Sequence, residues 1–202
     1  MKLEEILQLN PRETLLLVID IQKDFLESQP GFTFFDAGVD LSNMQQMVRA
    51  NLLPFVLGSL DSGVKVAYSK AYYPINKFPP PFDKLCSAVP GTDFYLIGGI
   101  KGIAKVKVFA KSEHDPFTNQ ELADYVERNG IKDVILTGVT LTHCIEEAAK
   151  SAVRRGLRAI IPSDCVSYRT ERTQQAMEIL GRYSSPEEKR VVVVNSGQIR
   201  YS

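Results

Sequence analysis

The sequence predicts an α/β protein, a three-layer sandwich in which helices cover both faces of a parallel sheet. Two observations lead to this fold class. Short runs rich in Val, Ile and Leu recur along the chain, and such runs are typical of strands buried on both faces. Longer amphipathic segments separate these runs, and this alternation implies right-handed crossovers between parallel strands.

Six of the apolar runs are expected to form the sheet. We predict strands at Thr14–Asp20, Val64–Ser69, Val106–Ala110, Asp133–Gly138, Leu157–Ser163 and Arg190–Asn195. The 202 residues are about one domain's worth, and no linker, repeat or low-complexity tract divides them. Residues 1–202 are therefore predicted to form a single domain.

Four segments have the apolar periodicity of helices. The clearest is 145–153, where apolar side chains recur at intervals of three and four and Gly156 follows as a stop signal. Helices are also expected at Asn119–Asn129, at Glu171–Tyr183 and within Leu41–Leu60. Because Pro54 interrupts the last segment, we expect that helix to be kinked or to start late.

The segment Lys70–Lys105 differs from the rest of the chain. Its many Pro and Gly residues exclude a helix of useful length, and long irregular stretches in compact domains are usually functional loops. The segment is also rich in aromatic and aliphatic residues, which would be a liability on the surface of a monomer. We therefore predict a homo-oligomer, a dimer or tetramer, with this segment near the subunit contact. The alternative is a lid that folds back over its own sheet.

Composition excludes several kinds of partner. Lys and Arg together number 24, as do Asp and Glu, so the zero net charge predicts no nucleic-acid partner. No apolar run approaches the ~20 residues that a membrane span needs, and the N-terminus lacks a signal peptide's apolar stretch. Three cysteines are too few for a disulfide scaffold, so we expect a reduced, cytoplasmic protein.

No cofactor or metal is expected. The first predicted strand is not followed by the G-x-G-x-x-G motif of dinucleotide-binding proteins. The chain has two histidines and no C-x-x-C pair, which argues against a zinc site.

Three chemically active side chains follow the ends of predicted strands. Asp20 ends the first strand, Lys111 follows the third, and Cys144 begins a helix after the fourth. Ligands of open α/β sheets bind at the carboxyl ends of strands, so these side chains are expected to converge. A cation and a helix N-terminus both lower a thiol's pKa, which makes Cys144 a candidate nucleophile. Each residue alone also has a structural interpretation, as a small buried hydrophobe, a capping acid or a surface lysine.

Three motifs in this order resemble those of the isochorismatase-like cysteine hydrolases, and together they span nearly the whole chain. The first is the D-x-Q-x-D-F pattern, and the others surround the lysine and the cysteine. In this sequence they are Asp20-Ile-Gln22-Lys-Asp24-Phe25, then Lys111 with Asp115, Phe117 and Thr118, then Gly138-Val139-Thr140 with Cys144.

The resemblance implies a six-stranded parallel sheet with Rossmann-like topology and a catalytic triad of Asp20, Lys111 and Cys144. It also implies a cis peptide bond before Thr140, which in the family aims backbone N–H groups at an oxyanion. The donors here would be the N–H groups of Thr140 and Cys144. Substrate contacts are expected from the three residues Gln22, Phe25 and Tyr73.

The sequence departs from the family pattern in three places. Leu141 and Thr142 stand where the family often has Thr-Asp, and Ala148-Ala149 stand where Thr-Ala often follows. Ala71 and Tyr73 occupy the places of the first Asp and His of the nicotinamidase metal set. The third departure argues against a metal-dependent nicotinamidase.

The resulting functional hypothesis is a cysteine hydrolase that cleaves a small amide-like substrate through a thioester. Two alternatives stay open. One is vinyl ether hydrolysis of the isochorismatase type, and the other is a non-catalytic α/β module that binds a small ligand at the same rim.

Overall fold

A computed structural model describes residues 6–27, 41–80, 82–87, 92–95, 106–169, 172–183 and 190–202. Much of the predicted segment Lys70–Lys105, including Leu96 and Ile97, lies outside these residues, as does Glu171 at the start of a predicted helix. Among the described residues, no helix is long and apolar enough to cross a membrane.

The main sheet contains the six predicted strands, and all of their pairings are parallel. The strands are β2 (Thr14–Ile19), β3 (Lys65–Ala71), β4 (Lys107–Lys111), β5 (Asp133–Val139), β6 (Arg158–Pro162) and β8 (Val191–Val194). Their order is β4-β3-β2-β5-β6-β8, and a short strand, β7 (Val166–Ser167), also pairs with β5. The connections leave β2 toward β3 on one side and return to β5 on the other. The switch point of the sheet therefore lies between β2 and β5.

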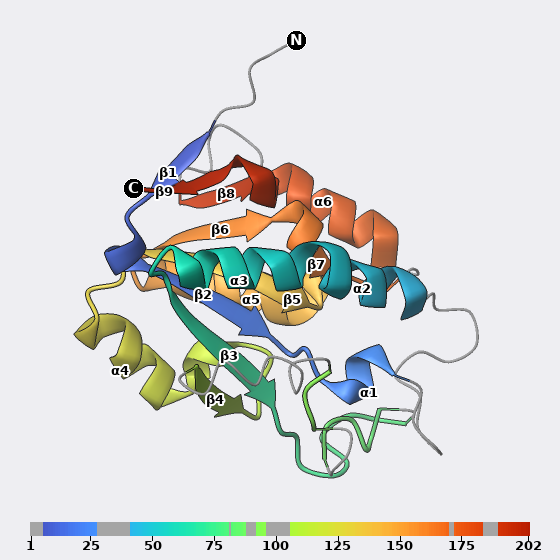
Figure 1. Cartoon of the computed structure of the whole chain (residues 1–202). Coiled ribbons are helices and arrows are strands. Elements are labelled where there is room, and N and C mark those ends of the chain that lie inside the picture. Colours follow the sequence, from blue (N-terminus) through green and yellow to red (C-terminus); the bar gives the residue numbers. More distant parts are fainter. Residues whose placement is uncertain are drawn as a thin grey trace.

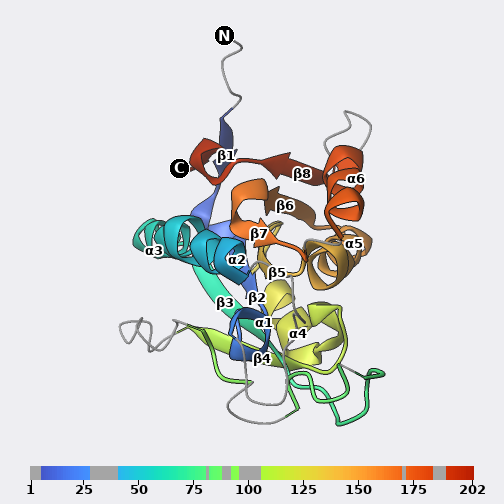
Figure 2. The ribbon, with the colours of Figure 1, turned by 90° about the vertical axis from the view of Figure 1, so that its right-hand side faces the viewer.

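Helices form the two outer layers (Figure 2). On one face lie α2 (Leu41–Met47) and α3 (Leu53–Asp61), and on the other lie α4 (Gln120–Arg128), α5 (Glu146–Arg154) and α6 (Thr173–Tyr183). Strand β2 serves both layers, since Leu16 and Val18 join the core on one face while Leu15 and Leu17 join the core on the other. The predicted three-layer α/β sandwich is confirmed.

The predicted helix Leu41–Leu60 accommodates Pro54 without starting late. A π-helical turn, Val48–Leu52, joins α2 to α3, and the Leu53 N–H donates to the Val48 carbonyl. Pro54 then falls in the first turn of α3, directly after the π-helical turn, and the helical segment continues through it.

Several short elements were not predicted from the sequence. Strands β1 (Leu7–Leu9) and β9 (Ile199–Tyr201) pair in parallel as a separate small sheet. Figure 1 shows the two strands side by side, close to the C-terminus. Helix α1 is a single turn, Lys23–Leu26, directly after the D-x-Q motif. Elements of three or four residues are too short to show a periodicity, which is why the pattern did not reveal them.

The described part of the segment 70–105 folds back over its own sheet. Tyr73, Leu85 and Tyr95 are buried, whereas Tyr72 and Ile75 remain 57% and 67% exposed. The chain itself therefore covers part of the loop's apolar surface, as in the lid alternative, and leaves Tyr72 and Ile75 exposed. The subunit contact near this segment stays a prediction.

Candidate active site

The site begins where β2 and β5 approach each other. Gly138 has φ +108°, and a Cβ there would lie 2.1 Å from the Ile19 carbonyl oxygen. Only glycine allows this contact, which brings the end of β5 against the end of β2. The chain then turns at Asp20, whose own φ is +55°, a conformation that aspartate tolerates better than most residues. The local backbone thus turns Asp20 toward the switch point.

Asp20, Lys111 and Cys144 come together there. Lys111 Nζ lies 2.8 Å from Asp20 Oδ2 and 3.3 Å from Cys144 Sγ. The side chains of Lys111 and Asp20 are 1% and 0% exposed, so this is a fully buried ion pair. The Asp20 carboxylate also interacts with the Cys144 thiol, whose pKa it raises. A buried carboxylate is costly, so its retention here points to a function. The convergence predicted from the three strand ends is therefore what the structure contains.

Lys111 is held by oxygen atoms as well as by its charge partner. Its ammonium donates to the carbonyls of Glu113 and His114 at 3.1 and 3.2 Å, and lies 3.4 Å from the Tyr73 hydroxyl. Burial is the largest single effect and lowers the pKa of Lys111, but the interactions with Asp20 and Cys144 together outweigh it and the net pKa is raised. The lysine is therefore a permanent cation beside the thiol.

The thiol of Cys144 is protonated in this arrangement. Burial raises its pKa to about 12, although Lys111 acts in the opposite direction. The cation expected from the sequence is present, but burial outweighs its effect. Since Cys86 and Cys165 are also buried free thiols, burial does not distinguish the three cysteines. What distinguishes Cys144 is its contact with Lys111.

The backbone around Cys144 forms a strand-to-helix turn. The Val139–Thr140 peptide bond is cis, and a π-helical turn, Leu141–Ile145, leads into α5. The Thr140 carbonyl accepts hydrogen bonds from the N–H groups of His143 and Ile145. Cys144 lies within this turn, close to the N-terminal end of the helical segment.

A cavity of about 220 Å³ opens onto the thiol. Its walls combine aromatic rings with two histidines and two arginines. The described lining residues are Phe25, Tyr73, Phe78, Pro79, Phe82, Leu85, His114, Thr140, His143, Cys144, Arg169 and Arg172. Of the residues predicted to contact substrate or oxyanion, Phe25, Tyr73, Thr140 and Cys144 line this cavity.

Gln22 is placed differently. Its side-chain amide is fully buried and is not among the lining residues. Nε2 donates to the carbonyls of Ala71 and Thr92 at 2.9 and 3.1 Å, while Oε1 accepts from the Ala71 N–H at 2.7 Å. The expectation of a substrate contact from Gln22 is corrected to a structural one, because these bonds join the end of β3 to the 92–95 segment.

The predicted site residues did not include the arginines and histidines of the cavity. His114 Nδ1 lies 3.7 Å from Cys144 Sγ, and its ring stacks on Phe78 and lies 5.4 Å from that of His143. Burial lowers the pKa of both histidines, that of His143 to about 4. Neither histidine was predicted to line the site, and Arg169 and Arg172 carry no motif that could have revealed them.

No three His, Cys, Asp or Glu side chains within the described ranges lie close enough together to hold a metal ion. At the two positions that correspond to the nicotinamidase metal set, Ala71 is buried and the Tyr73 hydroxyl faces Lys111.

The fold and the site together define a class: a doubly wound α/β protein with a cysteine, a lysine and an aspartate at its switch point. Comparison with known families sharpens this, because the isochorismatase domain model matches residues 14–181. The chain belongs to the isochorismatase family and is a hydrolase of that family.

Individual relatives are more distant. A ureidoacrylate amidohydrolase, RutB, of Acinetobacter baylyi is 26% identical over 168 residues, which cover 72% of this chain and 67% of the relative. A cysteine hydrolase structure from Pseudomonas syringae superposes with a TM-score of 0.76 at 16% identity, covering 98% of this chain and 96% of the other. An N-carbamoylsarcosine amidase structure from Thermoplasma acidophilum gives 0.70 at 18% identity, covering 91% and 96%. These structural likenesses establish the fold.

Proposed function

We propose that this protein is a cysteine hydrolase that cleaves the C–N bond of a small amide, with Cys144 as nucleophile, Asp20 as acid–base and Lys111 as the electrostatic partner of both. One observation carries the proposal: a thiol facing a small cavity lies 3.3 Å from a buried lysine that is paired with a buried aspartate. The amide activities named for RutB and the Thermoplasma enzyme support the same chemistry.

Acylation begins with the protonated thiol. Asp20 takes the proton from Cys144 while sulfur attacks the carbonyl carbon of the amide, so that the S–C bond forms and the carbonyl oxygen becomes negative. Proton transfer moves the negative charge from the Asp20 carboxylate to the Cys144 sulfur, and Lys111 stabilises that charge in both positions. The C–N bond then breaks, and Asp20 returns its proton to the departing nitrogen.

Hydrolysis of the thioester uses the same acid–base residue. Asp20 takes a proton from a water molecule while the oxygen of that water attacks the acyl carbon. The C–S bond breaks, the carboxylic acid leaves, and the proton passes to the Cys144 sulfur. The cycle needs no redox partner and restores every group to its starting state.

The oxyanion of each tetrahedral intermediate is assigned to the backbone N–H groups of Thr140 and Cys144. Both residues line the cavity, and the Cys144 N–H is in the first turn of the helix. The positive end of that helix adds to the effect. A donor of this kind contributes about 3–4 kcal/mol to the barrier reduction.

The decisive test is a screen of small amides, ureas and carbamoyl compounds for ammonia release. Turnover should be lost in Cys144→Ala, and intact-mass spectrometry of the wild type should detect an acyl adduct on Cys144 during turnover. Cys165→Ala is the matched control, since Cys165 is a buried thiol beside Asp164 and Ser196 instead of a lysine. A folded Cys144→Ala protein that still turns over would refute the assignment.

The mechanism uses no metal, so activity should survive exhaustive chelation. The measurement is the rate after dialysis against EDTA, with and without added zinc. Inactivation by EDTA that zinc reverses would contradict the mechanism. The proposed nucleophile must also stay a free thiol, which suits the reducing cytoplasm that we expect.

The chain is further proposed to assemble as a dimer or tetramer, with the segment 70–105 near the contact. Tyr72 and Ile75 are the exposed apolar residues of its described part. Sedimentation equilibrium at micromolar concentration tests this directly. A 22.6 kDa species would end the oligomer proposal.

A further inference from the structure

The charge of the cavity is one-sided. Arg169 and Arg172 both line it, and no Asp or Glu is among its described lining residues. Most of the remaining wall is apolar, formed by rings such as Phe25, Phe78 and Phe82. Low-dielectric walls focus the field of a charge that lies among them, so the two arginines act more strongly here than on an open surface.

The fold places the arginines close to the nucleophile turn. Arg169 follows β7, whose Val166 and Ser167 pair with Gly138 and Val139 at the end of β5. The chain therefore leaves the sheet beside the same strand end that leads to Cys144. The Arg169 guanidinium also lies 5.1 Å from the centre of the Phe82 ring, which fixes it against the aromatic wall.

A backbone hydrogen bond holds Arg172 next to Arg169. Its N–H donates to the Arg169 carbonyl at 2.8 Å, and its guanidinium donates to Gln175 at 3.1 Å. Both arginines act to lower the pKa of His143, the residue next to Cys144. Their positive field therefore reaches the immediate neighbour of the thiol.

We propose that the substrate is an anionic amide, whose carboxylate is bound by Arg169 and Arg172 while its scissile carbonyl faces Cys144. This inference rests on the proposed function and adds the substrate class. A planar guanidinium with several N–H donors matches the geometry of a carboxylate, which favours arginine for this role. The cavity of about 220 Å³ is smaller than the sites that hold drug-sized ligands, so the ligand is a small acid amide.

Two alkylating reagents of similar size test whether the cavity prefers an anionic reagent to a neutral one at Cys144. This test does not require turnover. Iodoacetate carries a carboxylate where iodoacetamide carries a neutral amide, and both place the same CH₂ group on sulfur. The rates at Cys144 are followed by peptide mass spectrometry and divided by those for the neutral thiol N-acetylcysteine amide. We expect the wild type to favour iodoacetate by about tenfold after this correction, and less so at high salt.

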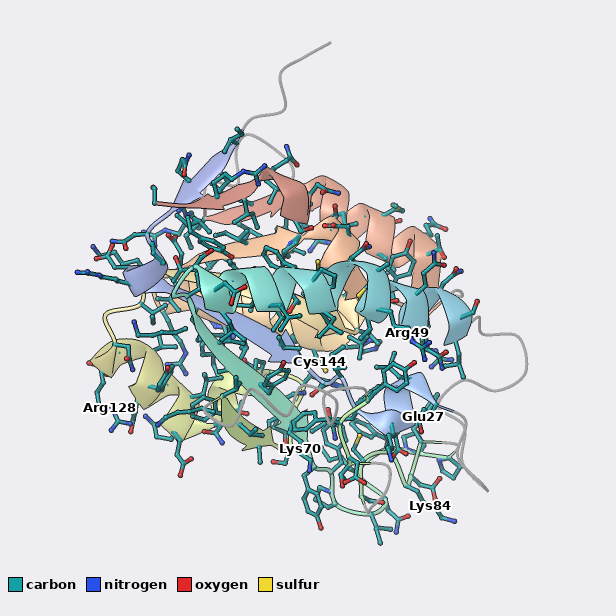
Figure 3. All side chains as sticks on the ribbon, in the orientation of Figure 1. Glu27, Arg49, Lys70, Lys84, Arg128 and Cys144 are labelled. Atoms are coloured by element: carbon teal, nitrogen blue, oxygen red, sulfur yellow. The ribbon has the colours of Figure 1, made fainter. Side chains whose placement is uncertain are left out.

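Substitution of the arginines separates their effect from that of Lys111. Arg172→Gln should reduce the preference, and Arg169→Gln combined with Arg172→Gln should reduce it to about twofold or less. Arg128→Gln is the matched control, because Arg128 lies on α4, far from Cys144 in Figure 3. That variant should behave as the wild type.

Two results would overturn the anionic substrate. One is an equal corrected rate for both reagents in the wild type, and the other is a preference that the arginine variants leave unchanged. Either result, together with intact amide hydrolysis, refutes only the substrate class. A preference that depends on the arginines, in a protein that hydrolyses no amide, supports the anion site and refutes the proposed reaction.

Discussion

The amino ends of the parallel strands form one edge of the sheet, the amino edge, and their carboxyl ends form the other, the carboxyl edge. Each edge carries an aspartate paired with a cation, but the two pairs differ in burial and in their partners. At the amino edge, Asp133 and Arg158 occupy paired positions on β5 and β6 and form two hydrogen bonds of 2.7 and 2.9 Å. Their side chains are 12% and 37% exposed. At the carboxyl edge, Asp20 and Lys111 are excluded from solvent, and their third partner is the Cys144 thiol.

The difference separates a structural ion pair from a functional one. The bidentate pair uses both oxygens of Asp133, so nothing remains for chemistry. At the other edge the Asp20 carboxylate interacts with both Lys111 and the Cys144 thiol, so it is placed to accept a proton from sulfur. Burying two charges is expensive, so a buried pair is weak evidence for stability. A buried ion pair next to a thiol is the arrangement expected where the charges take part in a reaction.

The largest contrast should appear in activity. Asp20→Asn removes the base while preserving shape, and we expect kcat to fall by about 10⁴-fold, as for members of other catalytic triads. Asp133→Asn, at the amino edge, should leave kcat within about twofold, because removing a distant structural pair does not touch the reacting atoms. Steady-state kinetics on the amide found in the screen gives both numbers. Comparable losses in the two variants would erase the distinction.

Stability should separate the edges next. Lys111→Met leaves Asp20 buried without its cation, which should cost about 3–5 kcal/mol of unfolding free energy. Adding Asp20→Asn to Lys111→Met removes the stranded charge and should recover most of that loss. Arg158→Met leaves the largely buried Asp133 without its bidentate donor but close to solvent, and should cost less, about 1–3 kcal/mol. Urea denaturation measures all three, and a double variant no more stable than Lys111→Met would contradict this explanation.

A glycine at each edge gives a third comparison. Gly138→Ala would place a Cβ 2.1 Å from the Ile19 carbonyl, so β2 and β5 must separate. We expect a loss of about 3 kcal/mol or more, together with loss of activity. Gly130, before β5, has φ +60°, and a Cβ added there would meet no described atom within 4 Å, so Gly130→Ala should cost only about 1–2 kcal/mol. Thermal or urea unfolding of the two variants checks the difference.

The last comparison concerns a pH dependence of stability at the carboxyl edge. The folded pKa of His143 is about 4, below its ordinary value of 6.5. Between these values the unfolded chain binds the proton that the folded chain refuses, so stability is complete above pH 6.5 and falls as the pH drops toward 4. His143→Gln should flatten this part of the profile of unfolding free energy against pH. An unchanged slope in that variant would show that other groups are responsible.

The predicted strands and catalytic residues follow from local patterns. Runs such as Thr14–Ile19 are apolar at every position but the first because both faces of a central strand are covered, and that property is visible in the sequence. Parallel strands also present their carboxyl ends at one edge. Asp20, Lys111 and Cys144 could therefore be grouped from the order of the strands along the chain.

Other features depend on contacts between distant segments. Gln22 belongs to the same motif as Asp20, yet its amide turns into the protein and binds Ala71. The pKa of Cys144 follows from how deeply the thiol is buried, which a helix N-terminus and a neighbouring lysine do not reveal. Arg169 and Arg172 enter the cavity because β7 pairs with β5, and a two-residue strand has no periodicity to predict.

The sequence by itself therefore determined the layers, the strands and the residues at the strand ends, because the local apolar pattern of each element indicates which of its faces are buried. Only the tertiary structure decided which side chains share the cavity, how the Asp20 carboxylate is paired and which charge lines the cavity. These depend on strand order and on the contact between Gly138 and Ile19, which are set by the packing of residues distant in the sequence.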